Sequence, residues 1–178
     1  ASFFHIMRRQ LKWSFRKPLI VFTPKSLLRH PKCVSTLDEM ANGKFVEVID
    51  DASSIEKSVD TVVFCTGKFY YDLLEKQETL GGTDNIAIVR VEQLYPLPQI
   101  QLDKVVAKYT NAKNYIWTQE EPENMGAWSH MLRHFTSVNL KQVTLAESGS
   151  PATGSSKAHA VRHGNILDSV FKYALVKK

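Results

Sequence analysis

The sequence is poor in cysteine and has no long apolar run. Its 178 residues include two cysteines, Cys33 and Cys65, which are too few for a disulfide-stapled scaffold and lack metal-ligand spacing. We therefore expect two reduced thiols, as in an intracellular protein. No apolar stretch approaches the ~20 residues that span a bilayer, so we expect no membrane partner. With 43% hydrophobic and 10% aromatic residues, the chain can bury a core.

Acidic residues are absent from the first 33 positions, which hold eight Lys and Arg. Residues 34–140 carry a net charge of −7 and residues 141–178 a net charge of +4, so an acidic body lies between two basic ends. This asymmetry indicates an anionic partner or ligand near the termini. Trp13 and Phe15 interleave with basic residues, as in proteins that stack nucleic-acid bases. The basic arm is short and an apolar run follows it, so nucleic acid is kept only as an alternative and is not our predicted partner.

Strand and helix patterns alternate along the chain. Phe3, Ile6, Met7 and Leu11 have helical spacing, so we expect the chain to begin inside a helix, as a piece of a longer protein. We expect strands at residues 19–23, 45–49, 60–66, 86–91, 114–118 and 142–146, and helices at 34–40, 68–79, 99–109, 125–135 and 166–175. The pattern predicts an α/β fold, a three-layer domain around a mainly parallel sheet.

Several catalytic signatures are missing. The sequence contains no P-loop pattern, no GxGxxG, no GxSxG and no HExxH. Thr66-Gly67-Lys68 follows a predicted buried strand and opens a helix, a junction that can present N–H groups to an anion. We favour a tight turn with a solvated lysine there, and an inert buried thiol at Cys65. These residues predict no catalytic group.

An acidic stretch, residues 120–124 (EEPEN), follows the predicted strand at 114–118, where open α/β sheets build sites. Carboxylates there can act as acid and base or bind a metal. Neighbouring strand residues face opposite sides, so Glu120 and Glu121 need not share a site. We favour a structural role, in which Asn124 caps the next helix.

Two pairs of histidines have i, i+4 spacing: His130 with His134, and His159 with His163. That spacing suits a metal ion. The first pair has no third ligand that the sequence identifies, and Lys157 and Arg162 lie beside the second and would repel a cation. We therefore predict surface or interface histidines and no metal site.

Five ungapped blocks carry a resemblance to a known family. They are residues 4–10 (FHIMRRQ), 16–31 (RKPLIVFTPKSLLRHP), 64–75 (FCTGKFYYDLLE), 89–96 (VRVEQLYP) and 119–128 (QEEPENMGAW). In this order they closely resemble the 2-oxoglutarate dehydrogenase E1 family, which depends on thiamine diphosphate. The resemblance covers essentially the whole chain and is weakest over residues 136–178.

The resemblance implies a transketolase C-terminal-type fold, an α/β sandwich with a mixed, mostly parallel sheet. Residues 1–16 would end a preceding domain or form a linker helix, and residues 17–178 would be the C-terminal domain of a longer E1 chain. The full enzyme would decarboxylate 2-oxoglutarate and succinylate the lipoyl group of its E2 partner, as a homodimer in the bacterial cytoplasm or mitochondrial matrix. Thiamine diphosphate and Mg²⁺ would bind upstream, so this chain alone should hold neither and be inactive. A 2-oxoadipate-type E1 is an alternative.

The same resemblance implies an effector site. In actinobacterial relatives this domain binds the activator acetyl-CoA, and the matching positions here are Gln10, Lys44 and Gln93. Two further positions of that site fall on Glu47 and Leu94, where this sequence departs from the pattern, and Glu47 would oppose a phosphate. The predicted roles are therefore assembly within E1 and regulation by acetyl-CoA or a nucleotide. The alternative is a solvated Lys44 and a Gln93 that caps a loop.

Overall fold

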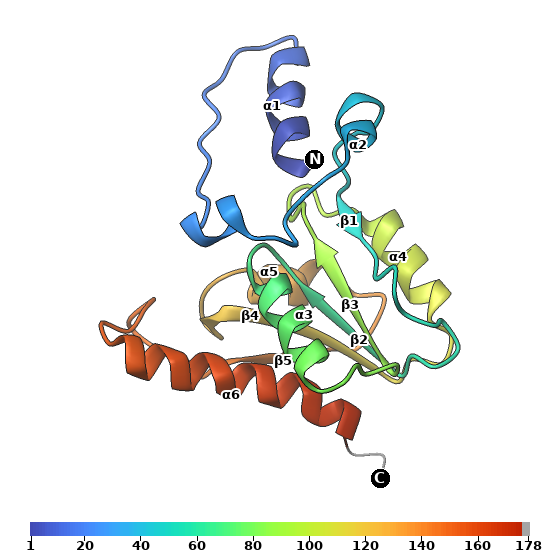
Figure 1. Ribbon diagram of the computed structural model, residues 1–178, viewed down its shortest axis with the longest axis vertical. Coiled ribbons are helices and arrows are strands. Elements are labelled where there is room, and N and C mark those ends of the chain that lie inside the picture. The colour runs from blue at the N-terminus through green and yellow to red at the C-terminus, as the bar shows by residue number, and fades with distance from the viewer. Residues whose placement is uncertain (176–178) are drawn as a thin grey trace. The chain divides into compact units, whose positions relative to one another are not determined.

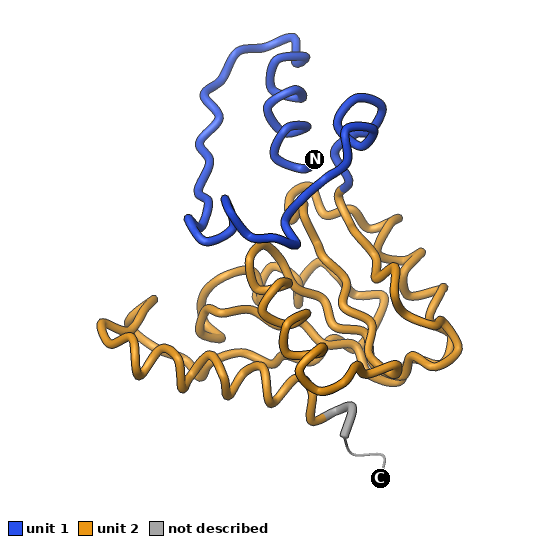
Figure 2. Tube along the Cα trace, in the orientation of Figure 1, with its two compact units in different colours: residues 1–46 blue, residues 47–178 orange. Residues whose placement is uncertain are grey.

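The computed structural model describes the backbone of residues 1–175 and the side chains of residues 1–172. The chain divides into two compact units, residues 1–46 and residues 47–178 (Figure 2). The division predicted after residue 16 stays a prediction, and residues 176–178 of the predicted domain lie outside the described residues. No helix in the described part of the chain is long and apolar enough to cross a membrane.

The first unit contains three short helical segments. They are α1 (Ser2–Lys12), the 3-10 turn η1 (Lys25–Arg29) and α2 (Leu37–Ala41). The predicted opening helix is confirmed. His5 is buried, and its Nε2 is 2.7 Å from the carbonyl oxygen of Glu39. Thr36 and Glu39 form a capping box that starts α2.

The strand predicted at residues 19–23 is wrong. This segment forms no strand, and its side chains are exposed, including Ile20 at 74% and Phe22 at 95%. A continuous apolar run has the same sequence pattern whether it forms a buried strand or an exposed segment, so the pattern alone does not show which of the two is formed. Pro18 and Pro24 flank the segment, and neither has a backbone N–H to give to a ladder.

The second unit is built on a five-stranded sheet (Figure 1). Its elements, in chain order, are β1 (Val48–Ile49), β2 (Thr61–Cys65), α3 (Phe69–Thr79), β3 (Ile86–Val91), α4 (Gln99–Lys108), β4 (Asn114–Pro122), α5 (Trp128–His134), β5 (Leu140–Leu145) and α6 (Ser156–Leu175). The strand order is β1-β3-β2-β4-β5, with β1 antiparallel to β3 and all other pairs parallel.

Alternating side chains of the central strands build two cores. Val62 and Phe64 of β2 face one core with residues of α4 and α5, and Phe64 meets Phe135 edge to face at 5.3 Å. Val63 and Cys65 face the other core with residues of α3 and α6. Strands buried on both faces need a continuous apolar sequence, which explains the run in β2. The predicted α/β class, with a mixed, mostly parallel sheet between two helical layers, is confirmed.

Two element boundaries differ from the prediction in ways that matter for function. β4 continues to Pro122, which pairs with Leu145 of β5, so Glu120 and Glu121 belong to a strand and not to a loop. α6 begins at Ser156, ten residues before the predicted start. Its first turns are mostly exposed and contain Val161 as their one large apolar residue, so they carry no apolar period from which a helix can be predicted.

Candidate functional site

The strand–glycine–helix junction after β2 is present and holds an ion pair. Gly67 has φ +62°, in the left-handed region that favours glycine, and turns the chain into α3. The ammonium of Lys68 donates to Asp72 one turn along α3 and to Oε1 of Glu120 in β4 at 3.0 Å. The predicted tight turn is confirmed, but the predicted solvated lysine is wrong because two carboxylates hold it.

These contacts set the charge of Lys68. Burial by itself lowers the pKa of Lys68, but the hydrogen bonds to Asp72 and Glu120 outweigh it and raise the pKa above its ordinary value. The lysine is therefore a fixed cation whose charge is already neutralised by its neighbours. It does not offer the free ammonium that a diphosphate requires.

His163 of α6 joins this ion pair from the other side. Its side chain is 18% exposed, with Nε2 3.4 Å from Oδ2 of Asp72 and Nδ1 3.7 Å from Oε1 of Glu120. Phe69 packs edge-on against the ring at 5.4 Å between centroids. α3, β4 and α6 thus each contribute side chains to one polar cluster at the carboxyl end of the sheet.

His159 lies one turn before His163, with 5.5 Å between the two ring centroids. One potential ligand atom from each of Glu120, His159 and His163 lies within 4.8 Å of the other two. These residues line a cavity of about 480 Å³, whose wall includes Arg162, the end of β5 at Leu145 and most of the loop that follows it. Sequence reasoning did not connect Glu120 with this histidine pair, because the two segments are about 40 residues apart and only the fold brings them together.

The other histidine pair stays structural. The rings of His130 and His134 are 4.5 Å apart, and Nε2 of His130 is 2.8 Å from the carbonyl oxygen of Leu94. In the part of the chain that the structure describes, no carboxylate or thiol completes a ligand set with them. Spacing alone cannot separate the two pairs; their surroundings do.

Gln119 is the buried polar residue that sequence reasoning missed. It is 2% exposed, and its Oε1 accepts hydrogen bonds from the indole N–H of Trp117 and the backbone N–H groups of Ala127 and Trp128. The N-terminus of α5 is therefore capped from β4 and not by Asn124. Asn124 instead exchanges two hydrogen bonds with the backbone of Ser148, which corrects the predicted cap.

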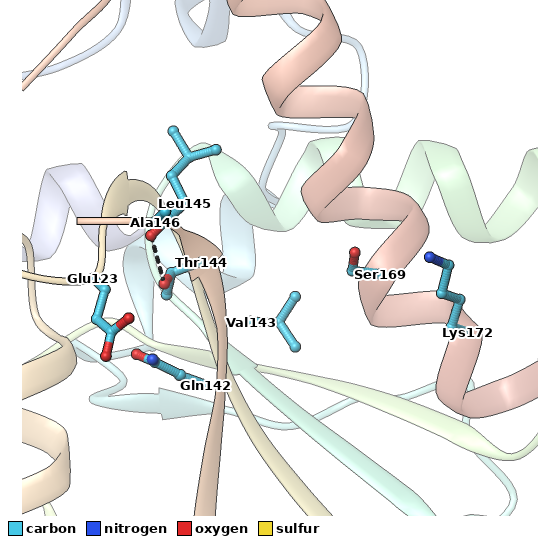
Figure 3. A pocket seen from close by; sticks show the side chains of 8 residues that line it. All are labelled: Glu123, Gln142, Val143, Thr144, Leu145, Ala146, Ser169 and Lys172. Atoms are coloured by element: carbon cyan, nitrogen blue, oxygen red, sulfur yellow. Dashed lines mark hydrogen bonds between the residues drawn. The ribbon is translucent and has the colours of Figure 1, made fainter. Parts of the chain in front are cut away.

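A second cavity of about 610 Å³ lies beside β5 and the C-terminal half of α6 (Figure 3). Figure 3 shows Glu123 and Gln142 close together on one side and Ser169 and Lys172 of α6 on the other. Oε1 of Gln142 is buried without a hydrogen-bond partner among the described residues. The hydroxyls of Thr144 and Ser169 donate to the backbone carbonyl oxygens of Leu145 and Asn165 and not to a base, so this cavity carries no catalytic assignment.

Of the three predicted effector residues, Gln10 and Lys44 belong to the first unit and Gln93 to the second. The amide of Gln10, in α1, donates to the carbonyl oxygen of Lys17, and Lys44 is exposed. Gln93 belongs to the second unit, where its amide donates to the carbonyl oxygen of Pro96 at 2.9 Å. Gln93 thus makes the predicted loop-capping contact. Convergence of these residues on one effector stays a prediction.

The described residues do not fit a thiamine diphosphate–Mg²⁺ group. The cation nearest to a phosphate-type junction, Lys68, is bound to Asp72 and Glu120, so a diphosphate would meet two carboxylates as well. Cys65 is fully buried, and burial raises the pKa of its thiol, which keeps it protonated and unreactive.

Comparisons with known proteins agree on one family. A family model described as 2-oxoglutarate dehydrogenase C-terminal matches residues 34–171. The chain is 44% identical to the 2-oxoglutarate dehydrogenase E1 component of Azotobacter vinelandii, over 96% of this chain and 19% of that protein. It is also 44% identical to the 2-oxoadipate dehydrogenase complex component E1 of Mus musculus, with the same two coverages. The chain thus spans about a fifth of the length of these relatives.

A structural comparison adds little. The chain resembles a 2-oxoglutarate:ferredoxin oxidoreductase from Magnetococcus marinus, solved with 2-oxoglutarate, coenzyme A and succinyl-CoA bound, at a TM-score of 0.46 and 16% identity. The match covers 70% of this chain and 20% of that one. A likeness at this level carries no argument, and the predicted kinship with transketolase C-terminal domains stays a prediction. The family model and the sequence relatives are decisive: the chain belongs to the 2-oxoglutarate dehydrogenase C-terminal family.

Proposed function

We propose that this chain is the C-terminal domain of a 2-oxoglutarate dehydrogenase E1 component and serves its assembly and regulation. In the full enzyme, 2-oxoglutarate is decarboxylated with thiamine diphosphate and Mg²⁺, and the succinyl group passes to the lipoyl group of E2. The proposed partners are the upstream E1 domains, a second E1 subunit and the E2 succinyltransferase. The proposed compartment is the bacterial cytoplasm or the mitochondrial matrix.

The observation that carries this proposal is the 44% identity over 96% of the chain to an E1 component of which it spans 19%. The polar cluster at the carboxyl end of the sheet agrees with a non-catalytic role. Asp72 and Glu120 hold the Lys68 ammonium there, His163 lies against both carboxylates, and these four side chains include no activated nucleophile.

The test is an assay of the purified 178-residue chain with 2-oxoglutarate, thiamine diphosphate, Mg²⁺ and ferricyanide as electron acceptor. We expect no substrate-dependent reduction, whereas a full-length E1 prepared in parallel reduces ferricyanide. Substrate-dependent turnover by the pure chain would overturn the non-catalytic role.

2-Oxoadipate is the second candidate substrate of the parent enzyme, because an E1 of the 2-oxoadipate complex matches with the same identity and coverage. The choice is tested in the full-length protein, by comparing kcat/KM for the two substrates. A higher value for 2-oxoglutarate supports the first candidate, and a higher value for 2-oxoadipate replaces it.

The regulatory part of the proposal rests on Gln10, Lys44 and Gln93 as an acetyl-CoA or nucleotide site. Support comes from the exposed Lys44, whose ammonium is accessible to a phosphate, and from the excess of basic residues at the start of the chain. Calorimetry with acetyl-CoA and AMP tests it. We expect Lys44→Ala to weaken binding and Lys57→Ala, a matched exposed lysine, to leave it unchanged. The absence of a heat of binding at millimolar acetyl-CoA and AMP would refute the proposed effector site.

A further inference from the structure

Two imidazoles and a carboxylate from different elements meet at the carboxyl end of the sheet. Glu120 comes from β4, and His159 and His163 come from successive turns of α6. One ligand atom from each lies within 4.8 Å of the other two. We propose that Glu120, His159 and His163 form a binding site for a divalent transition-metal ion of the zinc class.

The donor set is suited to that class of ion. Two histidine nitrogens and one carboxylate oxygen are the ligands of three-residue zinc sites, in which water takes the fourth position. Metal–ligand bonds of about 2.1 Å place neighbouring ligand atoms of a tetrahedral site about 3.4 Å apart. The present separations are at most 4.8 Å, so the side chains must close by no more than about 1.4 Å. His159 is exposed, so its side chain is the one that can supply this movement without disturbing the core.

Asp72 orients the second histidine. Oδ2 of Asp72 lies 3.4 Å from Nε2 of His163, so the other ring nitrogen, Nδ1, faces Glu120 at 3.7 Å. Metal-binding histidines usually hydrogen-bond through their second nitrogen to a carboxylate or carbonyl, which fixes the ring and its tautomer. The Asp72 carboxylate beside Nε2 of His163 is therefore in the place of such a partner, which is a second observation besides the spacing of the pair.

Lys68 is the competitor of the ion. Its ammonium is 3.0 Å from Oε1 of Glu120, the same oxygen that lies 3.7 Å from Nδ1 of His163, so the ion must displace the ammonium from this oxygen. With neutral imidazoles, Glu120, Asp72 and Lys68 together carry one negative charge, so a cation is still attracted. The basic neighbours Lys157 and Arg162 are exposed, and water and salt screen their repulsion.

The site is open to solvent. All three ligands line the cavity of about 480 Å³, which has room for water as the fourth ligand and for exchange of the ion. The bound ion would link the N-terminal half of α6 to β4. The buried residues of α6, Ile166, Val170 and Phe171, lie further along the helix. The metal would therefore fix the N-terminal half of α6, which is not packed into the hydrophobic core.

The experiment is calorimetric titration of the untagged, chelator-treated 178-residue chain with ZnCl₂ at pH 7.5. We expect one equivalent to bind. His159→Ala, which removes an exposed side chain and leaves the core intact, should weaken binding more than 100-fold. Asp72→Asn should weaken it by about 10–100-fold through the orientation of His163. Lys68→Met removes a competing positive charge and should tighten binding about tenfold.

His134→Ala is the matched control, because it breaks the other i, i+4 pair without touching this cluster; it should bind zinc as the wild type does. Circular dichroism of each metal-free variant verifies its fold, and His163→Ala gives a second variant in the same pair. Zinc binding that survives both His159→Ala and His163→Ala would overturn the proposal. So would a wild-type chain that takes up no zinc at millimolar concentration, since the cluster would then be only an ion pair. Neither result depends on turnover of a 2-oxo acid, so the E1 assignment stands or falls separately.

Discussion

Replacing Gln119 tests how the sheet and α5 are joined. The Gln119 amide bridges both elements: Oε1 accepts from the indole of Trp117 at 2.9 Å and from the backbone N–H of Trp128 at 3.0 Å, and Nε2 donates to the carbonyl oxygen of Met125 at 2.7 Å. Ala127, at the N-cap of α5, has no side-chain acceptor of its own. Gln119 therefore supplies from β4 the cap that the helix lacks.

Gln119→Ala leaves at least two of these buried donors without a partner. Each unsatisfied buried polar group costs about 1–3 kcal/mol, so we expect a loss of about 3–5 kcal/mol in the free energy of unfolding. That is a large share of the 5–15 kcal/mol typical of a domain. Gln119→Leu separates lost volume from lost hydrogen bonds, because it refills the space and still leaves the donors unpaired. It should cost nearly as much.

Urea unfolding followed by tryptophan fluorescence and by circular dichroism measures both variants. Glu121→Ala is the matched control, since it changes the exposed side chain two positions along the same strand and should stay within about 0.5 kcal/mol of the wild type. A loss below about 1 kcal/mol for Gln119→Leu would refute the reasoning, because water or rearranged partners would then satisfy the buried donors.

Three further outcomes are expected. Because the pKa of Lys68 is raised in the folded state, its ion pairs stabilise the fold fully below the unfolded pKa of about 10.4, and this contribution is lost as pH rises through the folded pKa. The difference in unfolding free energy between the wild type and Lys68→Met should therefore be constant from pH 7 to 9 and shrink above about pH 10.4. A difference that stays constant above that pH would contradict this prediction. Thr36→Ala removes the acceptor of the Glu39 N–H at 3.1 Å, and a cost of about 1 kcal/mol should speed exchange of that amide about fivefold; unchanged exchange would show that the cap contributes nothing. A thiol reagent should modify one cysteine in the native chain, the exposed Cys33, and two in denaturant, whereas rapid native modification of Cys65 would contradict its burial.

The central sheet was predictable because burial on both faces imposes a continuous apolar sequence. β2 and β3 therefore lie close to their predicted bounds. The same signal failed at residues 19–23, because an apolar run that is exposed in this chain has the same composition as a buried strand. The predicted start of α6 was ten residues too late for the opposite reason. The first turns of this helix are exposed to solvent and have no apolar stripe that the sequence could show.

The polar clusters were beyond prediction because they depend on contacts between distant segments. Lys68 and Glu120 lie 52 positions apart, and no spacing rule relates them. The i, i+4 pairing of His159 with His163 was visible, but only the register of β4 brings Glu120 to them. Gln119 gave no signal at all, because its partners are mostly backbone groups of a turn and a short helix.

The central claim is that this chain acts as the C-terminal domain of an E1 component without contributing catalytic groups. The most direct measurement is a replacement in the Azotobacter vinelandii E1 component, where this chain substitutes for the fifth of the protein that it matches. We expect the chimera to reduce ferricyanide in the presence of 2-oxoglutarate, whereas the E1 lacking that fifth does not. A folded chimera as inactive as the truncated protein would contradict the claim.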